Sequence, residues 1–237
     1  MKRIRIMGLC LVAAFALSAL AASIATAEPE FLTKTVVAEG VKIPIKATLG
    51  AAFLEGQSGS KITCTGGSST GEVTGPQTSK KNVSTFVGCE TGGLKCESGV
   101  TEGVIITKAL EAKLNGITSS LPGERLFDEG EGRGGKLAEF SCAGGSIVVI
   151  VKGSLIGSLS GAAGTGPETG KLLSTGTLTF AEAAGIQKYT SFSEGPEKGE
   201  KEQLEASVGG KPFEKSGQSV VAKITTVPTT WGLGVTK

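Results

Sequence analysis

Apolar and polar residues alternate along most of this chain in short segments that end at glycine. Val, Ile, Thr, Leu and Phe occupy every second position or form brief apolar runs, a pattern typical of β-strands. The expected strands cover residues 47–54, 61–65, 71–74, 84–88, 137–142, 146–156, 171–180, 186–192, 203–208 and 219–227. About ten short strands without a convincing long helix predict an all-β, single-domain fold, either a sandwich or a partly closed barrel.

The segment from residue 104 to 118 allows two interpretations. Its apolar residues share one parity, which favours a strand: Val104, Ile106, Leu110, Ala112 and Leu114. Asn115-Gly116 followed by Ile117-Thr118 is a typical hairpin turn. A helix over Lys108 to Leu114 remains the alternative, because Ala-Leu-Glu-Ala-Lys-Leu has good helix propensity. The run from Ile147 to Val151 is apolar on both parities and is therefore expected in a central strand.

The first residues have the form of a secretory signal peptide. Three basic residues (Lys2, Arg3 and Arg5) precede an apolar run over residues 6–20, and Ala25-Thr26-Ala27 is a small-x-small cleavage site. A membrane anchor is the alternative, but the run is shorter than the roughly 20 residues that a spanning helix needs. We expect cleavage after Ala27, secretion, a β-rich domain over residues 28–227 and a loosely ordered tail over residues 228–237, docked by Trp231.

Removal of the signal peptide changes the charge of the chain. It takes away three basic residues and leaves 21 Lys and Arg against 22 Asp and Glu. A near-neutral chain without a basic run gives no electrostatic footprint for nucleic acid, and no later apolar stretch reaches membrane length. The mixed charges between Glu194 and Glu205 predict a solvated loop.

Four cysteines remain after the signal peptide, namely Cys64, Cys89, Cys96 and Cys142. An even number in an exported chain predicts two structural disulfides. A zinc site is the weaker alternative, because Cys89 and Cys96 are seven residues apart and the chain has no histidine.

A repeated motif favours one of the three possible pairings. Ile62 to Ser68 resembles Phe140 to Ser146: each has an apolar residue, a hydroxyl residue, Cys, a small residue and Gly-Gly-Ser. Two strands with matching ends are plausible partners, which favours Cys64–Cys142 and Cys89–Cys96. The pairing Cys64–Cys89 with Cys96–Cys142 remains open.

The composition argues against most enzyme classes. Without histidine, the chain cannot form Ser-His or Cys-His nucleophilic systems or His-ligated zinc sites. The segment around its one aspartate, Asp128, is expected to be a flexible acidic loop and not a calcium site. Glutamates could serve glycoside hydrolysis, but Tyr189 and Trp231 are the only large polar aromatics for sugar stacking. We therefore expect no catalytic residues, no metal site, no cofactor and no enzymatic activity.

Several short elements together resemble a group of secreted actinobacterial proteins. They are Ile62-x-Cys64, Phe86-Val87-Gly88-Cys89, Lys95-Cys96-x-Ser98-Gly99, a strand from Gly103 to Thr107, Phe140-x-Cys142 and Val151-Lys152-Gly153-Ser154-Leu155-Ile156-Gly157. The resemblance spans about residues 45–225. It implies a signal peptide and a β-rich body, and it supplies no catalytic residue.

Two functions are compatible with these observations. The first is a non-catalytic secreted or cell-surface protein that presents loops or strand edges to an envelope or extracellular partner. The alternative is a carrier of a small apolar ligand, in which Phe53, Phe86, Phe140 and Phe180 line a cavity instead of filling a core. A contiguous apolar cavity above about 300 Å³ would favour the carrier, and a filled interior would favour the binding or structural protein.

Overall fold

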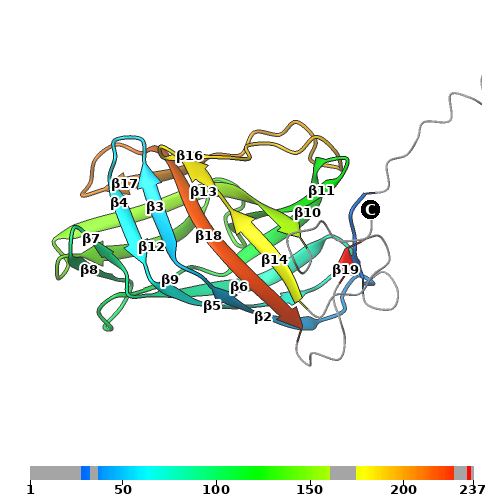
Figure 1. Ribbon diagram of the computed structural model, residues 1–237, viewed down its shortest axis with the longest axis horizontal. Coiled ribbons are helices and arrows are strands. Elements are labelled where there is room, and N and C mark those ends of the chain that lie inside the picture. Colours follow the sequence, from blue (N-terminus) through cyan, green and yellow to red (C-terminus); the bar gives the residue numbers. More distant parts are fainter. Residues whose placement is uncertain (1–27, 33–36, 161–174, 227–233, 236–237) are drawn as a thin grey trace, which may run out of the picture.

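The computed structural model describes residues 28–32, 37–160, 175–226 and 234–235 of the 237-residue chain. All regular elements in these residues are β-strands, and they run obliquely along an elongated body (Figure 1). The expected all-β fold is confirmed. None of the described residues belongs to a helix long and apolar enough to cross a membrane.

Fifteen strands form one antiparallel sheet, and two smaller sheets have two strands each. The strands of the large sheet are β2 (Ile43–Leu49), β3 (Ala52–Gly56), β4 (Lys61–Cys64), β5 (Gly66–Val73), β6 (Thr78–Val87), β7 (Glu90–Thr91), β8 (Leu94–Glu97), β9 (Val104–Ile106), β10 (Leu110–Thr118), β11 (Leu121–Asp128), β12 (Lys136–Cys142), β13 (Ile147–Ser160), β14 (Thr175–Phe180), β17 (Leu204–Val208) and β18 (Glu214–Thr226). The small sheets pair β1 (Phe31–Leu32) with β19 (Gly234–Val235), and β15 (Glu182–Ala183) with β16 (Ile186–Gln187).

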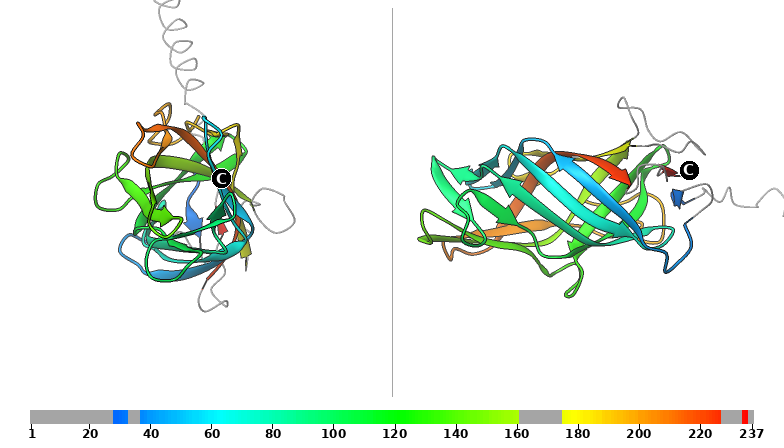
Figure 2. Two further views of the ribbon diagram at one scale, coloured as in Figure 1. Left: turned by 90° about the vertical axis from the view of Figure 1, so that its left-hand side faces the viewer. Right: turned by 90° about the horizontal axis from the view of Figure 1, so that it is seen from below.

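The pairings of the large sheet return to their starting strand in two circuits. One runs β2, β5, β6, β10, β11, β13, β14 and β18 and back to β2. The other runs β3, β4, β7, β8, β12, β13, β17 and β18 and back to β3. The two long strands, β13 and β18, belong to both circuits. Seen along the body in the left view of Figure 2, the strands surround a common interior.

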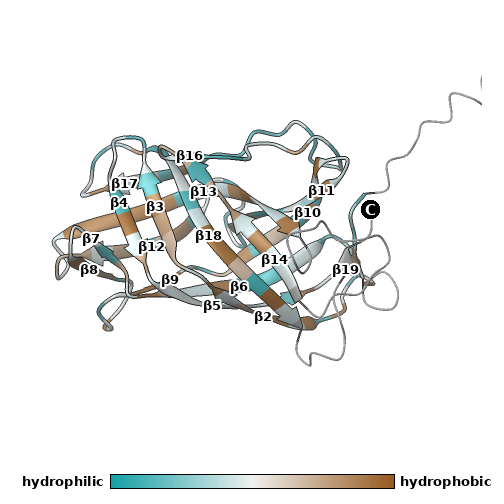
Figure 3. Ribbon diagram, in the orientation of Figure 1, coloured by the Kyte–Doolittle hydropathy of each residue, from teal (hydrophilic) through white to brown (hydrophobic). Residues whose placement is uncertain are grey.

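Two-residue alternation places the apolar side chains inside these circuits. On β13, Val149, Val151, Leu155 and Leu159 are buried in the main core, whereas Val148 on the opposite parity is 43% exposed. Burial of one face of each strand is the main stabilising contribution of such a sheet. Figure 3 shows apolar residues along the strands and hydrophilic ones in the connections near β16.

Several predicted strands have different bounds in the structure. The segment 47–54 is split between β2 and β3 by a bend at Ala51. Of the segment 186–192, only Ile186–Gln187 form a strand, and Phe192 forms an isolated bridge with Lys198. β11 was not predicted at all. Of the predicted segment 171–180, residues 171–174 lie outside the described residues, as does Val227 of the segment 219–227.

The hairpin predicted at Asn115-Gly116 and the alternative helix at Lys108 to Leu114 are both wrong. β10 continues through Asn115-Gly116 to Thr118, and the turn lies at Ser119-Ser120. Asn115 is 2% exposed, and its Nδ2 donates to Glu197 Oε2 at 3.0 Å. The Asn-Gly pair therefore stays in the strand because another segment of the chain binds it there.

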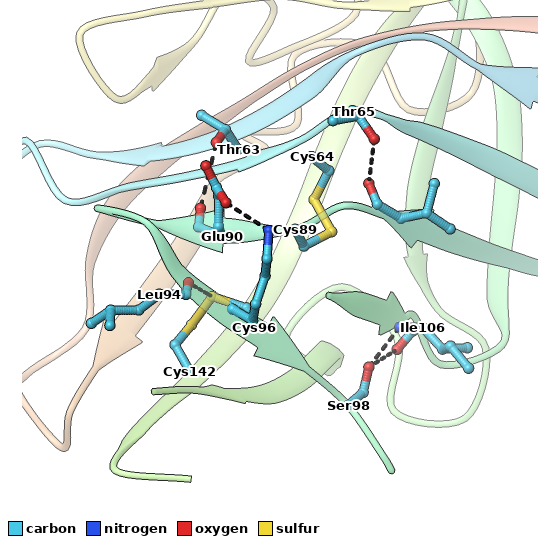
Figure 4. The surroundings of a disulfide bond; sticks show 12 residues. Thr63, Cys64, Thr65, Cys89, Glu90, Leu94, Cys96, Ser98, Ile106 and Cys142 are labelled. Atoms are coloured by element: carbon cyan, nitrogen blue, oxygen red, sulfur yellow. Dashed lines mark hydrogen bonds and ion pairs between the residues drawn. A yellow bond between two sulfur atoms is a disulfide. The ribbon is translucent and has the colours of Figure 1, made fainter. Parts of the chain in front are cut away.

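Two disulfides are present, as expected, but the favoured pairing is wrong. Cys64 is bonded to Cys89 and Cys96 to Cys142, with Cα–Cα distances of 4.0 and 3.9 Å (Figure 4). Sheet register explains this pairing, because Cys142 lies directly opposite Cys96 between β12 and β8. Cys89 directly precedes β7, which pairs with β4 at Thr63 and Glu90, so the other bridge joins the end of β4 to the residue before its neighbouring strand.

The motif that favoured the other pairing adopts two unrelated conformations. Gly66-Gly67-Ser68 lies in the extended strand β5. Gly144 and Gly145 lie in a turn with φ of +63° and +91°, in the left-handed region that glycine tolerates. Similar residues therefore serve a strand in one case and a hairpin turn in the other.

The first and last strands of the described residues, β1 and β19, pair with each other. Phe31 is 1% exposed and lies opposite Val235 in the β1–β19 pair. The predicted signal peptide and the rest of the predicted tail, with Trp231, lie outside the described residues.

Candidate ligand-binding site

A cavity of about 140 Å³ lies inside the sheet. Its walls come from strands of both circuits and are predominantly apolar, with Leu126, Leu155, Leu178, Val220 and Ile224 among them. The main hydrophobic core fills the rest of the interior around this space. The cavity is therefore lined by core residues and is partly open.

Three of the four phenylalanines named for the carrier hypothesis line this cavity with buried side chains. Phe86, Phe140 and Phe180 are 5–8% exposed. Phe53 also borders the cavity, but its ring carries the Lys61 ammonium 3.9 Å from its centroid. Since Lys61 is exposed, the Phe53 ring lies toward the outer face of the sheet.

One acidic side chain shares the apolar cavity. Glu124 on β11 is 7% exposed and lines the cavity together with Leu126, two positions further along the same face. Among the described residues, no hydrogen bond or ion pair reaches its carboxyl group. Glu124 lies opposite Leu114 of β10 and Gly157 of β13, which offer no polar side chain.

Burial determines the protonation of this group. Desolvation raises the pKa of Glu124 from 4.5 to about 7, because the ionised carboxylate loses water and gains no partner. Near neutral pH the carboxyl group therefore exists in both forms. A titratable group with a strongly perturbed pKa in a cavity is a candidate for function.

The glycine opposite Glu124 allows an aromatic ring to come close. A Cβ atom at position 157 would lie 2.8 Å from Phe180 Cε1 and 2.9 Å from Leu178 Cδ1, closer than side chains tolerate. Phe180 therefore lies over Gly157, on the strand beside Glu124. Glycine at this position gives the Glu124 part of the cavity an aromatic wall.

Three other polar side chains on the cavity wall, those of Ser69, Asn82 and Ser84, have partners. Ser84 Oγ donates to Ser69 Oγ at 3.1 Å, and Ser69 Oγ donates to the carbonyl oxygen of Val83 at 3.1 Å. Asn82 Nδ2 donates to the carbonyl oxygen of Leu110 at 3.1 Å. These groups satisfy one another or the backbone, which distinguishes them from Glu124.

The opposite face of β11 is also buried, and there the charges are paired. Arg125 forms ion pairs with Glu197 and with Glu202, the latter at 3.1 Å, and Ser154 Oγ donates to Glu202. Arg125 and Glu202 are each 3% exposed. Glu124 and Arg125 are adjacent on β11 and point to opposite faces. The Glu124 carboxyl group faces the cavity without a partner, and the Arg125 guanidinium is ion-paired on the outer face.

These ion pairs attach the segment 188–203 to the outer surface of β11 and β13. Phe192 packs on Ile117 and Ile156, and the backbone of Ser193 and Glu194 donates to the carbonyl oxygen of Gly116. The solvated loop predicted for residues 194–205 is therefore wrong in part. Three of its glutamates, Glu197, Glu200 and Glu202, form ion pairs with buried Arg125, which composition alone does not reveal.

The residues singled out from the sequence have structural roles. All four cysteines are in disulfides, and Cys64 also borders the cavity. Asp128 is 4% exposed, and its Oδ1 accepts from the backbone of Gly130 and Glu131, so it organises the turn after β11. The described part of the chain contains no group of three His, Cys, Asp or Glu residues that could hold a metal.

Comparison of the chain with protein-family models, with curated proteins and with solved structures found no match.

Proposed function

We propose that this protein is a non-enzymatic extracellular binding protein that holds a small apolar ligand in its interior. The observation that carries the proposal is the apolar cavity lined by Phe86, Phe140 and Phe180. In this proposal, the two circuits of strands act as a barrel around the ligand. This is the alternative function considered from the sequence, restricted to a smaller ligand, because the cavity does not reach the volume of about 300 Å³ named there for a carrier.

The volume of the cavity limits the ligand. At about 140 Å³ it is smaller than the roughly 300 Å³ at which sites for drug-sized ligands begin. It is close to the roughly 150 Å³ of an apolar protein cavity that binds benzene. The proposed ligand is therefore about one aromatic ring or a short branched alkyl group in size.

Extracellular location is supported by the chemistry of the cysteines. Two disulfides are typical of an oxidising environment, and the predicted signal peptide would deliver the chain there. A non-catalytic role is supported by the absence of histidine from the sequence. A partner in the envelope or outside the cell, bound through loops or strand edges, stays a second prediction.

Toluene binding tests the proposal. A ligand that binds only the folded state stabilises it, and at a concentration ten times Kd the gain is about 1.4 kcal/mol. We expect toluene to raise the Tm of the purified, oxidised protein by about 3–6 °C. Ala222→Leu fills part of the cavity and should abolish this rise, because Ala222 is 5% exposed and on the lining.

The matched control is Val221→Leu, at the next position of β18 and 43% exposed on the outer face. This variant should respond to toluene as the wild type does. Ala52→Leu is a second cavity-filling variant, in case Ala222→Leu does not fold, as judged by circular dichroism. The proposal is wrong if toluene leaves the wild-type Tm unchanged, or if the cavity-filling variants respond as strongly as the wild type.

A further inference from the structure

The cavity contains a single inward-facing charge. Glu124 is more than nine-tenths buried, and none of the described residues hydrogen-bonds to its carboxyl group or forms an ion pair with it. Lys46 is the other charged residue on the lining, but its side chain is exposed and points out of β2. The positive charge of Arg125 lies on the opposite face of β11, where Glu197 and Glu202 neutralise it.

A buried carboxylate without a partner is costly, and a ligand that pairs with it removes that cost. The strands on either side of β11 place Leu114 and Gly157 opposite Glu124, and Phe180 lies over Gly157. Aromatic faces attract cations, as carboxylates do. One carboxylate among apolar and aromatic walls is suited to an ammonium group that carries an apolar body.

We propose that the ligand of this cavity is a small primary amine with an apolar body, and that the Glu124 carboxylate binds its ammonium group. This inference rests on the proposed function and specifies its ligand class. The cavity admits about one ring and a short amine-bearing arm, so benzylamine has the right size and chemistry to serve as a probe.

Other small ligands fit the site less well. A hydrocarbon fills the cavity but leaves Glu124 unpaired, and a carboxylate ligand would place a second negative charge beside it. An alcohol can donate one neutral hydrogen bond, which is weaker than a charge-assisted bond between ammonium and carboxylate. The comparison of amine, alcohol and hydrocarbon on one ring skeleton is therefore informative.

The experiment measures the Kd values of benzylamine, benzyl alcohol and toluene by titration calorimetry at about pH 8, where Glu124 is mainly ionised and a primary amine is protonated. In the wild type, benzylamine should bind about 10- to 100-fold more tightly than toluene. In Glu124→Gln, this preference should vanish while toluene still binds. Glu102→Gln, at an exposed turn residue, is the matched control and should keep the preference.

Each outcome decides between the two proposals. If toluene binds the wild type and benzylamine binds no more tightly, the amine inference is overturned and the proposed function stands. If no compound of the three binds, both are overturned. An amine preference that persists in Glu124→Gln, or tightest binding by benzyl alcohol, also overturns the role of the carboxylate.

A second measurement covers the case in which Glu124→Gln does not fold. In wild-type protein with ¹³C-labelled glutamate, benzylamine should shift the Glu124 carboxyl resonance and lower the pKa at which it titrates, whereas toluene should not lower it. An unchanged titration midpoint with bound benzylamine would overturn the inference.

Discussion

Replacement of Glu124 by glutamine should change how the stability of the protein depends on pH. In the folded protein, burial raises the pKa of Glu124 from 4.5 to about 7. The folded state therefore binds this proton more tightly than the unfolded state does. Stability from this group is fully present below about pH 4.5 and is lost as the pH rises through about 7.

The size of the effect follows from the two pKa values. A difference from 4.5 to about 7 corresponds to a loss of about 3 kcal/mol of unfolding free energy between acidic and mildly alkaline pH. Glutamine keeps the shape of the side chain but does not ionise. Glu124→Gln should therefore gain about 3 kcal/mol relative to the wild type between about pH 4 and pH 8.5, or roughly 6–12 °C in Tm.

Urea denaturation of both proteins across this pH range measures the difference. Glu102→Gln, which removes an exposed carboxyl group, controls for the general loss of one negative charge. The reasoning is refuted if the wild type and Glu124→Gln keep a constant difference in unfolding free energy at every pH.

Three further predictions concern the disulfides, the buried ion pairs and export. The two disulfides close loops with sequence separations of 25 and 46 residues, and the loss of loop entropy in the unfolded chain assigns them roughly 3.5 and 4 kcal/mol of stabilisation. Replacing both cysteines of either disulfide with alanine should therefore lower the unfolding free energy, measured in urea, by similar amounts. A difference above about 2 kcal/mol between the two double variants would contradict this. Arg125→Met should lower the unfolding free energy by about 3–5 kcal/mol, because it leaves Glu202 buried without its main partner. Arg133→Met, at a half-exposed arginine, should lower it much less. Equal losses in the two variants would contradict the role of Arg125 as the main partner of Glu202. N-terminal sequencing of the exported protein should begin at Glu28, and detection of Met1 on it would rule out cleavage after Ala27.

The all-β fold could be predicted from the sequence because alternation and glycine spacing are local signals. The inner positions of β10 follow the predicted parity through Leu110, Ala112 and Leu114. The parity changes before this strand, however, since Ile105 is 5% exposed and Ile106 is 47% exposed. The break between β9 and β10 depends on which strands pair with them, and this information is not local.

β11 could not be predicted, and neither could the candidate site that depends on it. Its sequence from Leu121 to Asp128 contains Glu124, Arg125 and Asp128, so neither parity is apolar. Both faces are nevertheless buried, one by the cavity wall and the other by the segment 188–203. A strand whose charges are all buried gives no amphipathic signal. The phenylalanines that line the cavity could be named from the sequence, because their side chains are apolar in any fold.

The sharing of β13 and β18 by both circuits has a consequence for the order in which the chain can fold. β18 covers residues 214–226, and until it joins, β2 and β14 in one circuit and β3 and β17 in the other lack a neighbour. Neither circuit of strands can therefore close before β18 has joined, so neither can guide the folding of the other. A chain that leaves the ribosome or crosses a membrane N-terminus first must therefore wait for β18, near its C-terminus, with four strand edges open to aggregation.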